Sequence, residues 1–164
     1  MPPIPHTHPQ TDWSLRPGRA DDVEIIAELR ARVLRDDLER LGRYDEYRVR
    51  RRLRDGFTPA HTRVVETDGA FAGCVTLRPD DTGDGLHLEH FYLTPETQGH
   101  GLGTAVLRTL LAHADARRLP VRLVVLQGSA ARRLYEREGF TVEWEDPVDL
   151  GMIREPAPAP APGR

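Results

Sequence analysis

Lysine is absent from this sequence of 164 residues, so all 23 basic residues are arginine. The absence excludes a lysine-dependent phosphate loop, a Schiff-base lysine and a lysine general base. The single cysteine, Cys74, cannot form an internal disulfide, and we expect it to be a small buried hydrophobic residue. No window holds the roughly 18 consecutive apolar residues of a membrane span. These absences remove several enzyme classes, disulfide-built folds and membrane helices.

A strong excess of charge of one sign is lacking as well. The formal net charge is -3 and the sequence pI about 6.2, which favours neither nucleic acid nor an anionic membrane surface as a partner. Any anion must therefore be bound by local groups. Residues 1–10 carry prolines and histidines where a signal peptide would have a charged region and an apolar stretch. We expect a cytoplasmic protein that binds neither nucleic acid nor membrane.

Length and composition predict one folded domain. Single domains commonly have about 100 to 200 residues, and a hydrophobic content of 38% can fill a core. Proline is concentrated at both ends of the chain, so we expect residues 1–11 and 155–164 to be disordered tails and residues 12–154 to form the domain. His6 and His8 fall in the first tail and are expected to be solvated rather than metal ligands.

Hydrophobic spacing and turn residues predict a mixed α/β fold. The expected elements, in chain order, are a strand at 13–16, a helix from about 22, a helix at 38–54 interrupted by Gly42, a hairpin of strands at 64–65 and 71–77, a strand at 86–94, a helix at 101–117, a strand at 121–126, a helix at 130–138 and strands at 140–144 and 150–154. The strand, helix and strand between 86 and 126 require a parallel crossover. We therefore expect a mostly antiparallel central sheet with one parallel pair at its middle and helices on its flanks.

The first helix has a regular apolar face. Ile25, Ile26, Leu29 and Val33 recur at three- and four-residue spacing. This spacing predicts that all four side chains face the core.

A glycine-rich turn joins the strand at 86–94 to the following amphipathic helix. Its residues are Gln98, Gly99, His100, Gly101, Leu102, Gly103 and Thr104. The first N–H groups of a helix are unpaired and bind phosphate, and glycines let the phosphate approach the main chain. A dinucleotide fingerprint would need its third glycine one residue later, and a Walker loop would need lysine. The turn therefore indicates a pyrophosphate held by backbone amides, with a tight connection that binds no ligand as the alternative.

Two linked motifs resemble the GNAT superfamily of N-acetyltransferases. The first family motif is Gln or Arg, two residues, Gly, one residue, then Gly or Ala, and Gln98, Gly101 and Gly103 match it. The second is a strand, a helix and Gly-Phe, matched by residues 124–140. Together the motifs span residues 86–140, and the order of elements before them is similar as well. Two motifs in the right order make the resemblance specific.

The second motif departs from the family at one position. The family often has asparagine just before the last helix, where this chain has Ser129. Serine also caps helices, so the motif keeps its cap with a shorter side chain.

The resemblance implies acetyl-CoA as co-substrate and no metal. Its pyrophosphate would bind the amides of residues 98–104, beside Ser129, and its pantetheine arm would run along the strand end formed by Phe91, Tyr92 and Leu93. That arrangement needs an exposed strand edge, which such folds create by splaying strands 86–94 and 121–126 apart. Whether acyl groups other than acetyl are used is left open.

Tyr135 and Glu89 are the candidate catalytic residues. A tyrosine at the position of Tyr135 donates a proton to the departing thiolate in the family, and the alternative is a core tyrosine. Glu89 is the one acid within strand 86–94, which suits a general base acting directly or through water. Its alternative is an ion pair with a neighbouring arginine, and His87 is the second candidate base.

Period-two alternation assigns the faces of this strand. It predicts Glu89 on the face of His87, Phe91 and Leu93, opposite His90 and its even-numbered neighbours. The same alternation would place His87 and His90 on opposite faces, where they could not share a metal.

The resemblance implies an N-acetyltransferase that moves an acetyl group from acetyl-CoA to a primary amine by direct attack in a ternary complex. The acceptor is a small molecule or a peptide, and its pocket is expected from residues 30–60 and 143–150, the parts outside both motifs. The alternatives are a non-catalytic acyl-CoA-binding or sensor module and, from the arginines of residues 48–54, an RNA-binding protein. The sequence allows a homodimer without indicating one.

Overall fold

The computed structural model describes residues 12–158 and residue 163. The predicted tail at 1–11, with His6 and His8, lies outside the described residues, as does most of 159–164. Within the described part of the chain, no helix is both long enough and apolar enough to cross a membrane.

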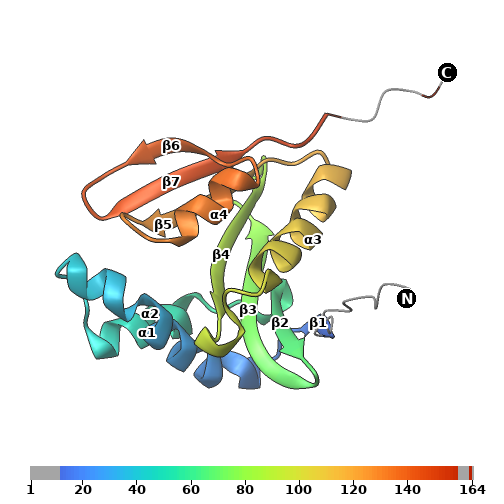
Figure 1. Ribbon diagram of the computed structural model, residues 1–164. Helices are drawn as coiled ribbons and strands as arrows, with labels where there is room; N and C mark the ends of the chain where they lie inside the picture. Colours follow the sequence, from blue (N-terminus) through green and yellow to red (C-terminus); the bar gives the residue numbers. More distant parts are fainter. Residues whose placement is uncertain (1–11, 159–162, 164) are drawn as a thin grey trace, which may run out of the picture.

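A seven-stranded sheet runs through the molecule in the order β1-β2-β3-β4-β5-β7-β6 (Figure 1). The strands are β1 (Trp13–Pro17), β2 (Thr62–Thr67), β3 (Ala70–Pro79), β4 (Leu86–Leu93), β5 (Val121–Leu126), β6 (Thr141–Glu145) and β7 (Asp149–Arg154). Every neighbouring pair is antiparallel except β4 and β5, which are parallel. The predicted fold class, a mostly antiparallel sheet with one parallel crossover at its middle, is confirmed.

Helices cover both faces of this sheet. They are α1 (Val23–Arg40), α2 (Glu46–Gly56), α3 (Leu102–Ala116) and α4 (Ala131–Arg137). The larger core cluster joins α3 and α4 to the sheet, with Val106, Leu107 and Met152 almost fully buried. A smaller cluster joins α1 and α2 to the opposite face, through Ile26 and Leu53. The two clusters hold the middle strands between two helical layers.

The first two helices differ from the sequence prediction. α1 continues to Arg40, and α2 begins only at Glu46, because Asp45 caps it: the Asp45 carboxylate accepts the N–H groups of Tyr47 and Arg48 at 3.0 and 2.9 Å. The single interrupted helix predicted at 38–54 is therefore wrong.

The predicted apolar face of α1 is wrong in one member. Ile25 is 45% exposed, whereas Ala27 is fully buried. The two small side chains on the buried side, Ala27 and Ala31, let α1 lie close to the sheet, and this turns Ile25 outward. Spacing alone cannot show which edge of an apolar stripe faces the core.

Candidate active site

The parallel strands β4 and β5 separate partway along their length. They pair only from Leu86 to Leu88 on β4 and from Val121 to Leu123 on β5. Residues 89–93 and 124–126 are therefore unpaired with each other, and each strand presents backbone N–H and C=O groups to the opening between them (Figure 1). The splayed strand edge that the family resemblance implies is present, and an extended ligand could replace the missing ladder hydrogen bonds.

A β-bulge in β4 lies at this opening. Cys74 pairs with Tyr92 and Thr76 with Glu89, so the single residue Val75 opposes two residues of β4. The bulge residue His90 has φ of +49°, and its carbonyl accepts a hydrogen bond from the Cys74 thiol at 3.1 Å. Burial raises the pKa of Cys74 to about 12, so the thiol keeps its proton and supports the bulge rather than reacting.

The bulge overturns the predicted faces of β4. Phe91 and Leu93 pack in the cluster of α3 and α4, whereas Tyr92 packs in the cluster of α1 and α2. His90 lies on the side of Glu89, because its Nε2 is 3.9 Å from a Glu89 carboxylate oxygen. Glu89 is therefore on the face opposite Phe91 and Leu93, contrary to simple alternation.

The bulge also overturns the reasoning that separated the two histidines. His87 and His90 both flank Glu89, at 3.8 and 3.9 Å from its carboxylate oxygens. Among residues 12–158 and 163, no three His, Cys, Asp or Glu side chains are grouped so as to hold a metal ion.

The glycine-rich turn leads into α3 with free backbone amides. Gly99 and Gly101 have φ of +81° and +80°, a conformation that favours glycine. A Cβ on either residue would have no atom within 4 Å, so the turn is open on its outer side. The first backbone hydrogen bond of the helix is donated by Ala105 to Gly101, which leaves the N–H groups of residues 102–104 without a helical partner. Gln98 Nε2 donates to the carbonyl of Leu93 at 3.0 Å and ties the turn to the end of β4.

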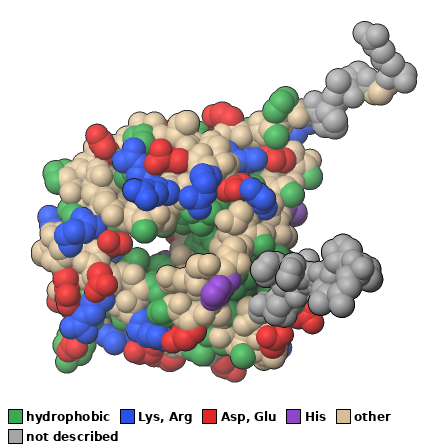
Figure 2. Space-filling model, viewed as in Figure 1, with side chains coloured by type: hydrophobic (Ala, Val, Ile, Leu, Met, Phe, Trp, Pro, Cys, Tyr) green, Lys and Arg blue, Asp and Glu red, His purple; other side chains and the backbone are tan. Residues whose placement is uncertain are grey.

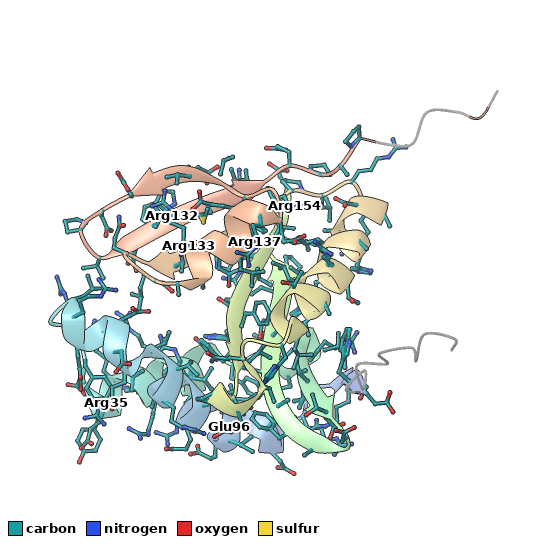
Figure 3. The ribbon with its side chains drawn as sticks, in the orientation of Figure 1. Arg35, Glu96, Arg132, Arg133, Arg137 and Arg154 are labelled. Atoms are coloured by element: carbon teal, nitrogen blue, oxygen red, sulfur yellow. The ribbon has the colours of Figure 1, made fainter. Side chains whose placement is uncertain are left out.

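Helix α4 packs beside this turn. A Cβ on Gly103 would lie 3.7 Å from Leu134. Ser129 Oγ accepts the N–H of Ala131 at 3.2 Å, but the N-cap position of α4 is held by Ala130, so Ser129 lies one residue before the cap. Arg132 pairs with Glu136 on the same helix. Arg133 and Arg137 are exposed, and neither has a carboxylate partner within the described residues (Figure 3). Two exposed arginines therefore lie on the helix that packs beside the start of α3.

Tyr135 lies on the buried side of α4. Its ring is 8% exposed and packs edge-on against Phe140, with the ring centroids 5.6 Å apart. Burial raises the pKa of Tyr135, so the phenol stays protonated at neutral pH. Of the buried side-chain polar atoms in the described residues, only Thr58 Oγ1 lacks a hydrogen-bond partner. The Tyr135 hydroxyl forms no hydrogen bond with any described group, so its proton is not engaged within the described residues.

Glu89 is held in a partly buried polar cluster. Arg78 Nε donates to Glu89 Oε1 at 2.8 Å, and the two side chains are 24% and 22% exposed. The ion pair that the sequence left as an alternative does form. One carboxylate oxygen accepts the arginine hydrogen bond, and the second lies 3.8 Å from His87 Nε2.

A chain of hydrogen bonds leads from this cluster to α1. His90 Nδ1 lies 3.3 Å from the Tyr92 hydroxyl, which accepts a hydrogen bond from Arg30 Nε at 3.1 Å. Because Arg30 can only donate, the tyrosine proton is available to His90 Nδ1. No local pattern in the sequence signals this arrangement, since it depends on the bulge at His90.

The two histidines should make stability depend on pH. Burial lowers the pKa of both His87 and His90 below the ordinary value of 6.5. As pH falls from about 7 to 5, the unfolded chain therefore takes up protons that the folded chain does not, and the free energy of unfolding falls. We expect the urea concentration at the unfolding midpoint to decrease over this pH range. The decrease should be smaller in the double variant that carries both His87→Gln and His90→Gln. Exposed His113→Gln is the control; an unchanged slope in the double variant would contradict the assignment.

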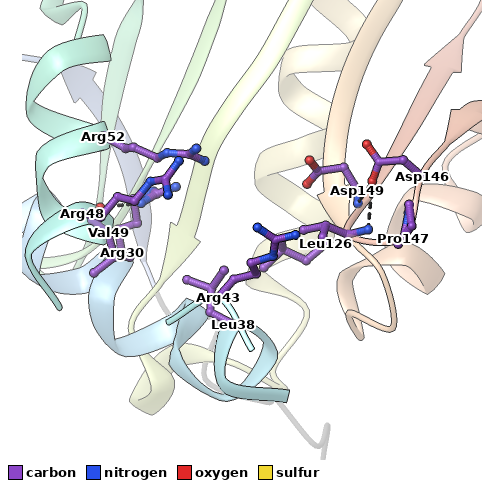
Figure 4. Close-up of a pocket in the computed structure, with 11 residues that line it drawn as sticks. Arg30, Leu38, Arg43, Arg48, Val49, Arg52, Leu126, Asp146, Pro147 and Asp149 are labelled. Atoms are coloured by element: carbon purple, nitrogen blue, oxygen red, sulfur yellow. Dashed lines mark hydrogen bonds between the residues drawn. The ribbon is translucent and has the colours of Figure 1, made fainter. Parts of the chain in front are cut away.

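A cleft of about 410 Å³ opens between the α1–α2 pair and the strand ends on the other side. Figure 2 shows this face hollowed between the half built by α1 and α2 and the half built by α4 and β5–β7. The lining residues are Arg30, Leu38, Arg43, Arg48, Val49, Arg52, Leu126, Asp146, Pro147, Val148 and Asp149 (Figure 4). Apart from Leu126, they belong to the two stretches from which the sequence predicts an acceptor pocket.

The cleft adjoins the opening between β4 and β5. Leu126 belongs both to the unpaired end of β5 and to the wall of the cleft. Arg30, on the other wall, is hydrogen-bonded to Tyr92 on the unpaired end of β4. A molecule in the cleft would therefore meet a ligand lying in the opening.

One family model covers most of this chain. The family model described as the acetyltransferase (GNAT) family matches residues 26–140. A search of the curated proteins gives no significant match.

Many solved structures share the fold. One is the PaiA N-acetyltransferase from Thermoplasma acidophilum in complex with coenzyme A, at 19% identity and a TM-score of 0.70 over 88% of this chain and 99% of that one. Another is an N-acetyltransferase from Staphylococcus aureus Mu50, at 18% identity and a TM-score of 0.66 over 85% and 99%. N-acetylglutamate synthase from Neisseria gonorrhoeae, complexed with coenzyme A and L-arginine, matches at 19% identity and a TM-score of 0.61 over 90% of this chain but 34% of its own.

Proposed function

Because the chain belongs to the acetyltransferase (GNAT) family, whose model covers residues 26–140, we propose that it transfers the acetyl group of acetyl-CoA to a primary amine by direct attack in a ternary complex. The observation that carries the proposal is the juxtaposition of the opened β4–β5 edge with the free amides at the start of α3. Two of the similar structures hold coenzyme A, which is the acetyl carrier that such a site suits.

Acetyl-CoA is placed by backbone groups. Its pyrophosphate accepts hydrogen bonds from amides of residues 99–104 at the positive end of α3, since the Gln98 N–H already donates to the carbonyl of Pro95. Arg133 and Arg137 lie on the adjoining helix α4, which Ser129 precedes. Its pantetheine amides pair with the free edge of β4 at residues 91–93, where Phe91, Tyr92 and Leu93 lie. This places the thioester at the junction of the opening and the cleft.

The transfer step uses two side chains. The amine nitrogen attacks the thioester carbonyl carbon, the C–S bond breaks, and the thiolate takes the proton of the Tyr135 hydroxyl. Glu89, directly or through water, accepts the proton that the amine loses, with His87 as the second candidate. Backbone N–H groups near Leu93 polarise the carbonyl oxygen. Holding both reactants together supplies the proximity that direct transfer needs.

A carboxylate at the start of α3 should expel the coenzyme without harming the fold. Thr104 is the third residue of the helix, where glutamate stabilises a helix through its dipole. A charge about 5 Å from the pyrophosphate costs on the order of 3 kcal/mol at an effective dielectric of about 20 before solvent screening. We expect Thr104→Glu to weaken acetyl-CoA binding roughly 10- to 100-fold in calorimetry while the melting temperature stays level or rises.

Thr104→Gln is the neutral control for this prediction and should bind as the wild type does. Gly101→Val is a poorer probe, because a β-branched residue at φ of +80° would strain the backbone. Equal affinity for acetyl-CoA in the Glu and Gln variants would contradict the placement of the pyrophosphate at the N-terminus of α3.

Release of free thiol from acetyl-CoA in the presence of an amine panel tests the function itself. A transferase releases thiol only when an amine is present and yields one N-acetylated product for each thiol. A non-catalytic acyl-CoA-binding module would bind acetyl-CoA in calorimetry and leave the thioester intact with every amine.

A further inference from the structure

The arginines of α2 divide into two groups. Three of them pair with carboxylates on α1 or on their own helix: Arg50 with Glu28 at 2.7 Å, Arg54 with Glu24 at 2.8 Å and Arg51 with Asp55 at 3.6 Å. Arg48 and Arg52 have no carboxylate partner among the described residues, and both line the cleft. The basic run is thus neutralised on its outer side and left unneutralised where it faces the cleft.

Two more arginines on the same side of the cleft lack an acidic partner in the described residues. Arg43 follows α1, and Arg30 lies on α1 itself. Arg30 is held in place, because its guanidinium donates to the Tyr92 hydroxyl at 3.1 Å and to the carbonyl of Val49. A guanidinium fixed by neutral partners keeps its charge and its remaining N–H donors for a ligand.

The facing wall carries two acids that differ in their surroundings (Figure 4). Asp146 accepts the N–H groups of Val148 and Asp149 at 2.8 and 2.7 Å, and these bonds lower the pKa of Asp146 and fix the turn before β7. The Asp149 carboxylate has no hydrogen bond within residues 12–158, and Asp149 pairs through its backbone with Leu126 at the end of β5. Burial and the neighbouring Asp146 raise the pKa of Asp149, against the opposing effect of Arg52 and Arg43 across the cleft.

The two walls of the cleft therefore carry charges of opposite sign. Within the described residues, four guanidinium groups without a salt bridge lie on the α1–α2 side, and the Asp149 carboxylate, which forms no hydrogen bond there, lies on the side of the opened strands. An amine that also carries an anion matches this pattern, with its anion on the arginines and its nitrogen toward Asp149 and the thioester. A simple polyamine does not, because its far end would meet the arginines and be repelled.

We propose that the cleft selects amines bearing a carboxylate or phosphate group, which the planar guanidinium groups of Arg30, Arg48 and Arg52 bind while the amine faces the opening. Carboxylate and phosphate share the geometry that arginine recognises in bidentate fashion. The turnover part of this inference rests on the proposed function, whereas binding of the anion in the cleft does not.

Matched acceptors test the selection. The carboxylate arm compares glycine, β-alanine and 4-aminobutyrate with their carboxamides; the phosphate arm compares O-phosphoethanolamine with ethanolamine; putrescine supplies a cationic far end. We expect kcat/KM to be about 10- to 100-fold higher for the anionic member of the best-fitting pair, as for a hydrogen bond to a charged group. The arm with the larger ratio identifies the anion. Equal kcat/KM within all pairs, or preference for putrescine, would overturn the proposal.

Neighbouring arginines on α2 provide the matched variants. Arg52→Gln should raise KM for the anionic acceptor about tenfold and leave the carboxamide unchanged. Arg51→Gln removes an arginine that pairs with Asp55 and is not among the residues lining the cleft, so it should change neither. Equal losses in the two variants would contradict a specific role for the cleft.

Calorimetric titration of the coenzyme A-loaded protein with the same pairs separates this inference from the proposed function. Tighter binding of the anionic member, lost in Arg52→Gln, supports the cleft even if no thiol is released, and in that case only the transferase assignment fails. If thiol is released with every amine and the anionic members do not bind more tightly, the proposed selection of anionic acceptors by the cleft is wrong. The transferase assignment then stands.

Discussion

Replacing Tyr135 by phenylalanine should lower kcat by roughly 10²- to 10⁴-fold, the range in which a positioned proton donor contributes. The ring and its edge-on contact with Phe140 remain, and the hydroxyl has no hydrogen bond within the described residues to lose. The variant loses only the proton that the departing thiolate takes. Affinity for acetyl-CoA and the melting temperature should therefore stay close to the wild-type values.

The measurements are kcat by thiol release, Kd by calorimetry and the melting temperature, all on the same preparation. Exposed Tyr47→Phe on α2, where the side chain is 78% exposed, is the control for removing a tyrosine hydroxyl. Unimpaired turnover in a folded Tyr135→Phe protein would make Tyr135 a core residue and reject its role as the acid.

Glu89→Gln should lower kcat/KM much more with an alkylamine acceptor than with a weakly basic one. An alkylamine with a pKa of about 10.4 is free in only about one molecule in 2,500 at pH 7, whereas an α-amine near 7.8 is free in about one in seven. The first acceptor needs a base, and the second hardly does. We expect a loss of roughly 10² to 10⁴ in kcat/KM with the alkylamine, much less with the weak base, and partial recovery of the mutant rate between about pH 6 and 9.5.

Glutamine keeps a carbonyl oxygen for Arg78, so the variant tests the proton acceptor more than the packing. Glu138→Gln is the matched control, because Glu138 also pairs with an arginine, Arg108 at 3.1 Å, outside the opening. Equal losses with both kinds of amine in Glu89→Gln, without recovery at high pH, would make Glu89 a structural partner of Arg78. Deprotonation would then occur in bulk water or through His87.

The sequence predicts the sheet, its parallel crossover and the open glycine-rich turn before α3 because each depends on local signals. Glycine spacing before an amphipathic helix marks the turn, and the Asp68–Gly69 hairpin marks the antiparallel pair β2–β3. The faces of β4 could not be predicted, since the bulge places His90 at φ of +49° without the glycine that usually signals such a conformation. This one residue decides that Glu89, His90 and Tyr92 share the side of α1.

The charge pattern of the cleft could not be predicted from the sequence either. Five arginines within residues 48–54 appear alike in the sequence, and only the placement of acids on α1 separates Arg50 and Arg54 from Arg48 and Arg52. Such pairs join residues about 20 to 30 positions apart, beyond the range of helical spacing rules.

A single-turnover experiment with enzyme in excess over acetyl-CoA labelled at the acetyl carbon tests direct transfer most directly. The reaction is quenched at intervals, and both the amine and the intact protein are examined by mass spectrometry. Labelled N-acetylamine should appear at the rate at which acetyl-CoA disappears, without acetylated protein, and Tyr135→Phe should slow both rates equally. Acetyl-CoA that stays intact with every amine, or label that enters the protein before the amine, would contradict direct acetyl transfer by this site.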